Sequence, residues 1–230
     1  MEIDELLSEK TYPGRGIIVG FSPQGRAVSA YFITGRSENS QNRLLVLEGD
    51  TLKAEPFEPS KDKGNPLIYY TALQQLDDML IISNGDHGDV VCSYLQKGKT
   101  FEDALKSCSY EPDEPHYTPR ISALVSLKEP YTYSLSIIKR SEGKPRRKFF
   151  KYSDPTRGGG QLVHTYKGEG SSLASFSGSP REVTIGEDIE TFSQKIWKAL
   201  DKDNRIALHV RYTDLADGTV EQRIFNKHTK

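Results

Sequence analysis

The chain of 230 residues carries 31 Lys and Arg against 32 Asp and Glu, and a net charge of −1 excludes both a broad basic field for nucleic acid and a polybasic membrane anchor. Its two cysteines, Cys92 and Cys108, are too few for a disulfide framework and lack the paired spacing of a zinc site, which favours a reducing cytoplasm. Since no apolar run reaches the length of a membrane span and residues 1–11 are polar, we expect one soluble, unprocessed domain over residues 1–230.

Residues 12–43 contain two apolar runs that lead directly into a dense cluster of polar side chains. The runs at 15–20 and 27–34 are rich in Ile, Val, Tyr and Phe, and the SPQG between them supplies the Pro and Gly of a tight reversal, so we predict a β-hairpin. Residues 35–43, GRSENSQNR, then offer two guanidinium groups, carboxamides and hydroxyls, which suit an anionic ligand with many hydrogen-bonding groups. A solvated loop with incidental charges is the alternative interpretation.

Shorter elements flank this hairpin. Residues 1–11 form a pattern typical of a short amphipathic helix, and residues 44–48 are typical of a strand. The charged, proline-bearing stretch 53–64 is predicted to be an exposed connection. Residues 79–83 have the β-branched density of a buried strand, and they end at a second polar cluster, NGDHGD at residues 84–89.

The middle and end of the chain combine helices with further strands. Residues 89–106 predict two helices joined by a glycine turn, the second capped by Thr100, and the three prolines of residues 110–120 predict a shaped loop. Residues 189–200 form an amphipathic stripe typical of a helix. Further strands are predicted at residues 121–127, 131–138, 144–152, 161–166, 206–212 and 220–226. This order of elements predicts an α+β fold built on an antiparallel sheet.

The sequence gives no support for several common kinds of site. The three glycines at 158–160 lack the Lys-Ser/Thr ending of a phosphate loop, and the basic stretch 139–151 is expected to be a solvated hairpin. The five histidines are scattered without a metal-binding pair, and no serine lies in a GxSxG elbow. We therefore expect no metal, no cofactor and no covalent nucleophile, and a site that acts by orientation, proton transfer and charge stabilisation.

Five separately placed segments carry a family resemblance. YPGRGIIVG, YFITGRSENSQNR, NPLIYY, ISNGDHGD and YEPDEPHYTPRI together resemble the archaeal-type IMP cyclohydrolase family with its bacterial relatives, over about residues 12–125 and with SFSGSPR as an extension. The resemblance implies closure of 5-formamidoimidazole-4-carboxamide ribonucleotide to IMP with loss of water, in the last step of de novo purine synthesis. It also implies the four-layer αββα sandwich of N-terminal-nucleophile hydrolases, without their self-cleavage.

The resemblance assigns catalysis to Arg36, Tyr70 and Glu111. Glu111 would take a proton from the carboxamide nitrogen, Arg36 would hold the developing oxyanion, and Tyr70 would give a proton to the leaving hydroxyl. A structural role for Glu111, as partner of a loop arginine, remains open. Arg43 and Arg120 would clamp the 5′-phosphate. The full substrate-binding set is Ser37, Asn42, Arg43, Asn65, Tyr69, Asn84, Asp86 and Arg120.

Two other functions remain open at this point. An amide hydrolase of the N-terminal-nucleophile type is weakened because no Cys, Ser or Thr opens the chain before its first strand. A catalytically silent module that binds purine nucleotides is the third interpretation. In each case the expected partner is a small purine ribonucleotide, with no nucleic acid and no membrane, and homo-oligomerisation is left open.

Overall fold

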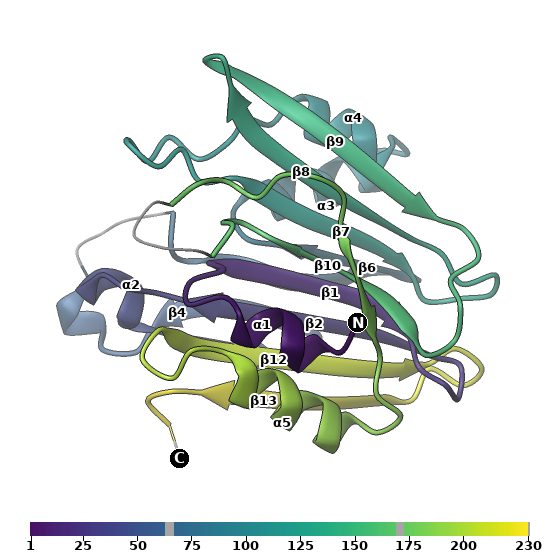
Figure 1. Ribbon diagram of the computed structural model, residues 1–230. Helices are drawn as coiled ribbons and strands as arrows, with labels where there is room; N and C mark the ends of the chain where they lie inside the picture. The colour runs from purple at the N-terminus through teal and green to yellow at the C-terminus, as the bar shows by residue number, and fades with distance from the viewer. Residues whose placement is uncertain (63–66, 169–172, 230) are drawn as a thin grey trace.

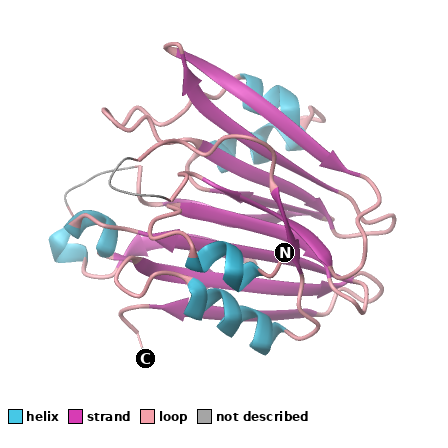
Figure 2. Ribbon diagram, viewed as in Figure 1, coloured by secondary structure: helices cyan, strands magenta, loops and turns pink. Residues whose placement is uncertain are grey.

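Two antiparallel β-sheets dominate the described part of the chain (Figures 1 and 2). The computed structural model describes residues 1–62, 67–168 and 173–229. One sheet has six strands in the order β11-β10-β1-β2-β12-β13, and the other has seven in the order β3-β4-β5-β6-β7-β8-β9. With a small number of helices, this is the α+β class that the sequence predicts.

The elements have the following bounds. The strands of the six-stranded sheet are β1 (Arg15–Phe21), β2 (Arg26–Thr34), β10 (Gly159–His164), β11 (Arg181–Thr184), β12 (Arg205–Asp214) and β13 (Val220–Asn226). Those of the seven-stranded sheet are β3 (Arg43–Glu48), β4 (Thr51–Pro56), β5 (Tyr70–Leu76), β6 (Met79–Ser83), β7 (Arg120–Ser126), β8 (Tyr133–Ser141) and β9 (Lys144–Tyr152). The helices are α1 (Ile3–Ser8), α2 (Glu38–Gln41), α3 (His87–Gln96), α4 (Phe101–Lys106), α5 (Ile189–Ala199) and the 3₁₀ turn η1 (Pro59–Lys61).

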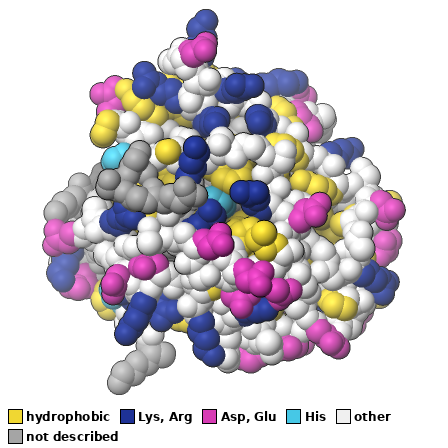
Figure 3. Space-filling model, viewed as in Figure 1, with side chains coloured by type: hydrophobic (Ala, Val, Ile, Leu, Met, Phe, Trp, Pro, Cys, Tyr) yellow, Lys and Arg dark blue, Asp and Glu magenta, His cyan; other side chains and the backbone are white. Residues whose placement is uncertain are grey.

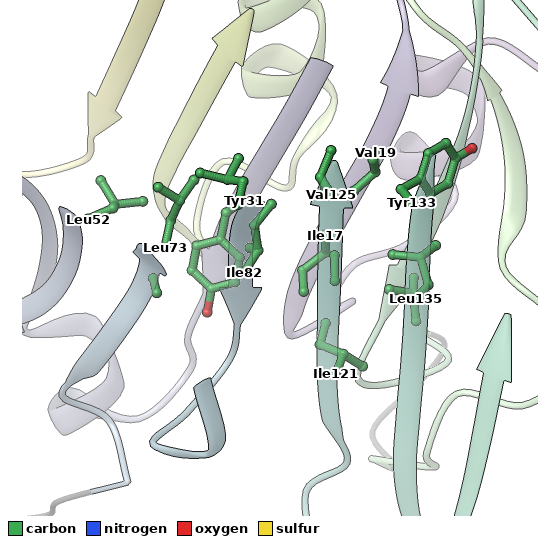
Figure 4. Packing of buried hydrophobic residues seen from close by; sticks show 14 of the residues in the cluster. Ile17, Val19, Tyr31, Leu52, Leu73, Ile82, Ile121, Val125, Tyr133 and Leu135 are labelled. Carbon is green, nitrogen blue, oxygen red and sulfur yellow. The ribbon is translucent and has the colours of Figure 1, made fainter. Parts of the chain in front are cut away.

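The two sheets pack face to face through a layer of apolar side chains, part of which is drawn in Figure 4. Successive side chains of a strand point to opposite faces, so β1 sends Ile17 and Val19 into this layer and Ile18 to the other side. From the facing sheet, Ile82 and Leu135 complete the layer. Strand β1 is consequently buried on both faces, which explains its near-continuous apolar sequence.

Helices cover the outer faces of both sheets. Helices α1 and α5 pack on the six-stranded sheet, where Leu6 and Ile196 join the cluster that contains Ile18 (Figure 1). Helices α3 and α4 pack on the seven-stranded sheet, where Val91 and Phe101 belong to a third cluster. Each of these four helices thus buries one apolar stripe, as its sequence pattern predicts.

Most predicted elements are confirmed. The opening hairpin is β1 and β2, and its turn places Gly25 at φ +83°, a left-handed conformation that glycine adopts without strain. The two central helices are α3 and α4, and the Thr100 hydroxyl caps the second by accepting from the Asp103 amide at 3.1 Å. The basic stretch is the solvent-facing hairpin of β8 and β9.

Two strands differ from expectation. The prediction of an exposed connection over residues 53–64 is wrong for its first part, because residues 51–56 form β4 between β3 and β5. Leu52 and Ala54 face the core, while charged side chains alternate with them and conceal the strand in the sequence. Strand β11 was not predicted, since Val183 is its one buried residue.

Candidate active site

The polar loops gather at one edge of the seven-stranded sheet. Neighbouring strands of an antiparallel sheet run in opposite directions, so the starts of β3, β5 and β7 lie at the same edge of the sheet as the ends of β4 and β6. This register brings Arg43, Tyr70 and Arg120, the first residues of β3, β5 and β7, to the same edge. Arg15, the first residue of β1 in the other sheet, reaches this edge by contacting Glu111 in the loop before β7.

The Arg15–Glu111 ion pair is the most deeply buried one among the described residues. Arg15 Nη2 donates to Glu111 Oε1 at 2.6 Å, and the two residues are only 8% and 2% exposed. Burial raises the pKa of Glu111 above its ordinary value, although the charge of Arg15 opposes that shift. Burial is the strongest single influence on Arg15 and acts to lower its pKa, but Glu111 and the nearby tyrosines together raise the pKa, so the guanidinium stays charged.

A pair of tyrosines lies next to this ion pair. The hydroxyl oxygens of Tyr31 on β2 and Tyr70 on β5 are 2.6 Å apart, so one phenol donates to the other across the interface of the two sheets. Arg43 is fully buried nearby and donates to the carbonyl oxygens of Ser40 and Thr34 at 2.9 and 3.3 Å. Two buried arginines and two phenols therefore interact with one another, and Arg15 joins this group to the buried carboxylate of Glu111.

A cleft of about 230 Å³ opens above Arg15 and Glu111. One wall is a stack in which the Arg36 guanidinium lies 4.3 Å from the ring centroid of Tyr12, whose ring stacks on Tyr166 at 5.7 Å. The remaining lining residues come from the α2 region, the segment before β5, the loop before β7 and the segment after β10: Ser37, Ser40, Leu67, Ile68, Asp113, His116, Thr118 and Leu173.

The loop of residues 110–118 lines both this cleft and a second cavity of about 650 Å³. The loop closes on itself, because the Glu111 amide donates to the Thr118 carbonyl at 3.0 Å. Glu111 and Thr118 line the first cleft, whereas Tyr110 and Tyr117 line the second cavity. The prolines of residues 110–120 predict a shaped loop, and the structure shows a loop whose side chains line two cavities.

Arg120, Asp86 and His87 form a polar cluster in the lining of the second cavity. Arg120 Nη1 contacts the Asp86 carboxylate and lies 3.0 Å from His87 Nδ1. Burial, with a contribution from the positive charge of Arg120, lowers the pKa of His87 to about 3, so its imidazole is neutral and serves as an acceptor for Arg120.

Comparison with known proteins identifies the family. The family model of the IMP cyclohydrolase-like proteins matches residues 12–218, which includes every element described around the cleft. The chain belongs to this family.

Individual IMP cyclohydrolases give the same result. The enzyme of Methanopyrus kandleri is 29% identical over 67% of this chain and 75% of its own length. That of Methanothrix thermoacetophila is 31% identical over 73% of this chain and 80% of its own. For the enzyme of Methanococcus maripaludis strain C5, 30% identity extends over 52% of this chain and 61% of that protein.

Residues of the family motifs line both cavities, some in the smaller cleft and others in the larger cavity. Of the residues expected in catalysis, Arg36 and Glu111 line the smaller cleft, and Tyr70 lies beside Arg15 with 8% of its surface exposed. Of those expected in substrate binding, Ser37 lines the same cleft, whereas Asp86 and Arg120 line the larger cavity. The roles of these residues stay predictions.

Other predicted binding residues are engaged with the backbone. Asn42 donates to the Glu58 carbonyl at 3.0 Å and accepts from the Glu58 amide at 2.8 Å. Asn84 donates to the Pro119 carbonyl at 2.9 Å and accepts from the Ile121 amide at 2.7 Å. Both amides therefore anchor loops of the site.

The last two predicted binding residues differ from these. Tyr69 is half-buried, and burial together with the nearby charge of Asp62 raises its pKa. Asn65 lies outside the described residues.

The sequence interpretation missed Arg15 and Tyr31. Both lie in apolar strands, where a polar side chain is easily taken for an edge residue or a core aromatic. A signal was nevertheless present, because Arg15 is a charged residue at the start of a strand that is otherwise apolar on both faces, and buried charges need partners. A lone tyrosine in a core strand gives no comparable signal.

Three further properties of the described residues concern metal binding, membrane-spanning helices and surface charge. Within the described residues, no group of three or more His, Cys, Asp or Glu side chains is arranged to hold a metal ion. No described helix is long and apolar enough to cross a membrane. Positive and negative side chains are interspersed over the face shown in Figure 3, in agreement with a net charge of −1.

Proposed function

We propose that the protein is an IMP cyclohydrolase, which closes 5-formamidoimidazole-4-carboxamide ribonucleotide to IMP with loss of water in de novo purine synthesis. The family match over residues 12–218 and the three archaeal relatives support this activity. The observation that carries the proposal is the cleft formed by the family motifs, in which the buried carboxylate of Glu111 lies against Arg15 and shares the lining with Arg36.

The reaction is a transfer of protons that needs no covalent intermediate. The carboxamide nitrogen attacks the formyl carbon and loses one proton, and the formamido nitrogen loses a second when the ring double bond forms. Both protons end on the formyl oxygen, which leaves as water. Such a site needs a base, an acid and a cation near the oxygen, which are the kinds of group that surround the cleft.

The position of each group suits one role. Glu111 is the base, because burial raises its pKa toward neutrality and so strengthens it as a proton acceptor. Arg36 is exposed at the mouth of the cleft and fixed over Tyr12, where its guanidinium can meet the formyl oxygen as that oxygen becomes anionic. Tyr70 is the acid that gives a proton to the departing hydroxyl.

Arg120 is the better of the two predicted phosphate ligands. It lines the larger cavity next to Asp86, while Arg43 is covered on all sides and bonded to backbone carbonyls. We therefore assign the 5′-phosphate to Arg120 and contacts with the ribose to Asp86. Arg43 contributes its positive charge from below the cleft.

The arrangement of layers supports a finer fold assignment. Two antiparallel sheets in contact, with α1 and α5 outside one and α3 and α4 outside the other, have the order of the four-layer αββα sandwich of N-terminal-nucleophile hydrolases. Proton transfer between Glu111, Tyr70 and the substrate uses no N-terminal nucleophile, so we propose this fold without autoproteolysis.

The deciding experiment adds the formamido ribonucleotide to chelator-treated protein and follows the ultraviolet absorbance of IMP. We expect IMP to form without added metal, and Glu111→Gln to abolish its formation. Binding of IMP without turnover would indicate a silent module, and release of free amine from simple amides would indicate a hydrolase. A strict requirement for a divalent metal would contradict the proton-transfer mechanism.

A further inference from the structure

Tyr31 is a polar side chain in the middle of an apolar strand. On β2 it pairs with Ile17 of β1 and His209 of β12, at the centre of the six-stranded sheet. Its ring crosses the apolar layer beside Ile82, as Figure 4 shows, and its hydroxyl meets that of Tyr70 on the facing sheet at 2.6 Å. A phenylalanine would fill this space without the need to satisfy a buried hydroxyl.

Burial raises the pKa of Tyr31 well above its ordinary value, so Tyr31 keeps its proton, and the positive charges of Arg15 and Arg43 act against that shift. Arg15 and Arg43 are both buried and both act electrostatically on the two phenols, whereas Glu111 pairs with Arg15 alone. Among the described residues, Arg15 Nε and Arg43 Nη1 have no hydrogen-bond partner. The cluster therefore holds two guanidinium charges against one carboxylate, and a phenolate formed within it would be stabilised.

We propose that Tyr31 is a positioning residue that holds the Tyr70 hydroxyl and stabilises Tyr70 when it loses its proton. The inference rests on the proposed cyclohydrolase function. As the bond between the ring carbon and the hydroxyl breaks, its electron pair stays on the oxygen, which takes the proton of Tyr70 and leaves as water. The Tyr70 phenolate then accepts the hydrogen bond of Tyr31 until the proton released by the formamido nitrogen restores it.

Tyr131 offers a matched comparison within the same core. It is buried like Tyr31, but its hydroxyl donates to the Gly20 carbonyl at 2.8 Å and its ring packs on Phe21. Neither contact involves a charged group. Removing the Tyr131 hydroxyl thus reports what a buried tyrosine contributes to stability alone.

The test compares Tyr31→Phe with Tyr131→Phe in steady-state assays with the formamido ribonucleotide. A hydrogen bond to a charged group corresponds to about 10- to 100-fold, so Tyr31→Phe should lower kcat by that factor and leave KM within about twofold. Tyr131→Phe should retain kcat. Because Tyr31 acts through Tyr70, adding Tyr31→Phe to Tyr70→Phe should lower kcat by no more than about threefold further.

Two outcomes would overturn the inference: a normal kcat in Tyr31→Phe, or a full additional loss in the double variant. If Tyr31→Phe does not fold, 3-fluorotyrosine at position 31 keeps the hydroxyl but makes it a stronger donor, so kcat should change by at least about twofold at constant KM. An unchanged kcat would equally refute the role. If instead the unmodified protein forms no IMP, the proposed function has failed and not this inference alone.

Discussion

The Arg15–Glu111 ion pair contributes to the stability of the fold in addition to its proposed role in catalysis. Replacing Glu111 by Gln would leave the Arg15 guanidinium buried without its counter-charge, a loss that costs about 3–5 kcal/mol in comparable buried pairs. A loss of turnover in Glu111→Gln therefore has to be separated from a loss of folded protein. Arg36 gives the cleaner test of catalysis, because it is exposed and its contacts lie at the mouth of the cleft.

We expect Arg36→Lys to lower single-turnover rates about 100- to 1,000-fold, the usual effect of removing one donor to an oxyanion, with little change in thermal unfolding. Lysine keeps the charge but lacks the planar fork that fixes Arg36 over Tyr12. Arg26→Lys is the control, because Arg26 makes the same kind of contact with Tyr212, at 5.4 Å, away from the cleft. A rate within about threefold of the unmodified protein would remove Arg36 from the mechanism.

The sequence predicts individual site residues unevenly. Arg36 and Glu111 are predicted through the family motifs that contain them, and both line the smaller cleft. Asn84 lines neither cavity, and the sequence does not distinguish a ligand contact from the two backbone hydrogen bonds that its amide makes. Tyr31 is missed because its partner Tyr70 is 39 positions away, and only the packing of the two sheets joins them.

Among the elements, α5 depends on a single residue at its start. Asp188 is the N-cap, and its carboxylate accepts from the Thr191 amide at 2.8 Å. Asp188→Ala should lower the free energy of unfolding by about 1 kcal/mol, as measured by chemical denaturation, and leave kcat unchanged. Asp188→Asn keeps the acceptor and should retain nearly all of the stability. An equal loss in both variants would mean that charge, not capping, is what stabilises the helix start.

Elements are predictable where local chemistry alone decides them. The β1–β2 turn, the Thr100 cap and the stripe of α5 each follow from residues close together in sequence. Strand β4 does not, because its charged residues alternate with Leu52 and Ala54, and a strand so short is recognised only when β3 and β5 pair with it. Tertiary pairing, not propensity, determines that segment.

At the scale of the whole molecule, the sequence predicts an α+β fold built on an antiparallel sheet but not which cavities the elements create. The apolar faces of the strands and helices require sheets packed together and helices outside, as the packing of Ile17, Ile18 and Phe101 in three separate clusters demonstrates. The shapes of the two cavities depend on how the loop of residues 110–118 folds, and its two prolines, Pro112 and Pro115, restrict that loop without defining its path.

Three buried histidines make the stability of the molecule sensitive to acid. Burial lowers the pKa of His87 and His164 to about 3 and that of His209 to about 4. An unfolded histidine titrates near 6.5, so below that pH the unfolded chain binds protons that the folded chain does not. The stability they contribute is complete above pH 6.5 and is lost as the pH falls toward 4.

Each of these histidines should add a slope of about 1.4 kcal/mol per pH unit to the free energy of unfolding between about pH 6 and pH 5. Chemical denaturation at these two pH values should show His209→Gln with a slope smaller by that amount, because glutamine takes up no proton. Tyr131→Phe, which retains His87, His164 and His209, should keep the full slope. Equal slopes in His209→Gln and the unmodified protein would mean that His209 is already protonated in the folded state, against the effect expected of its burial.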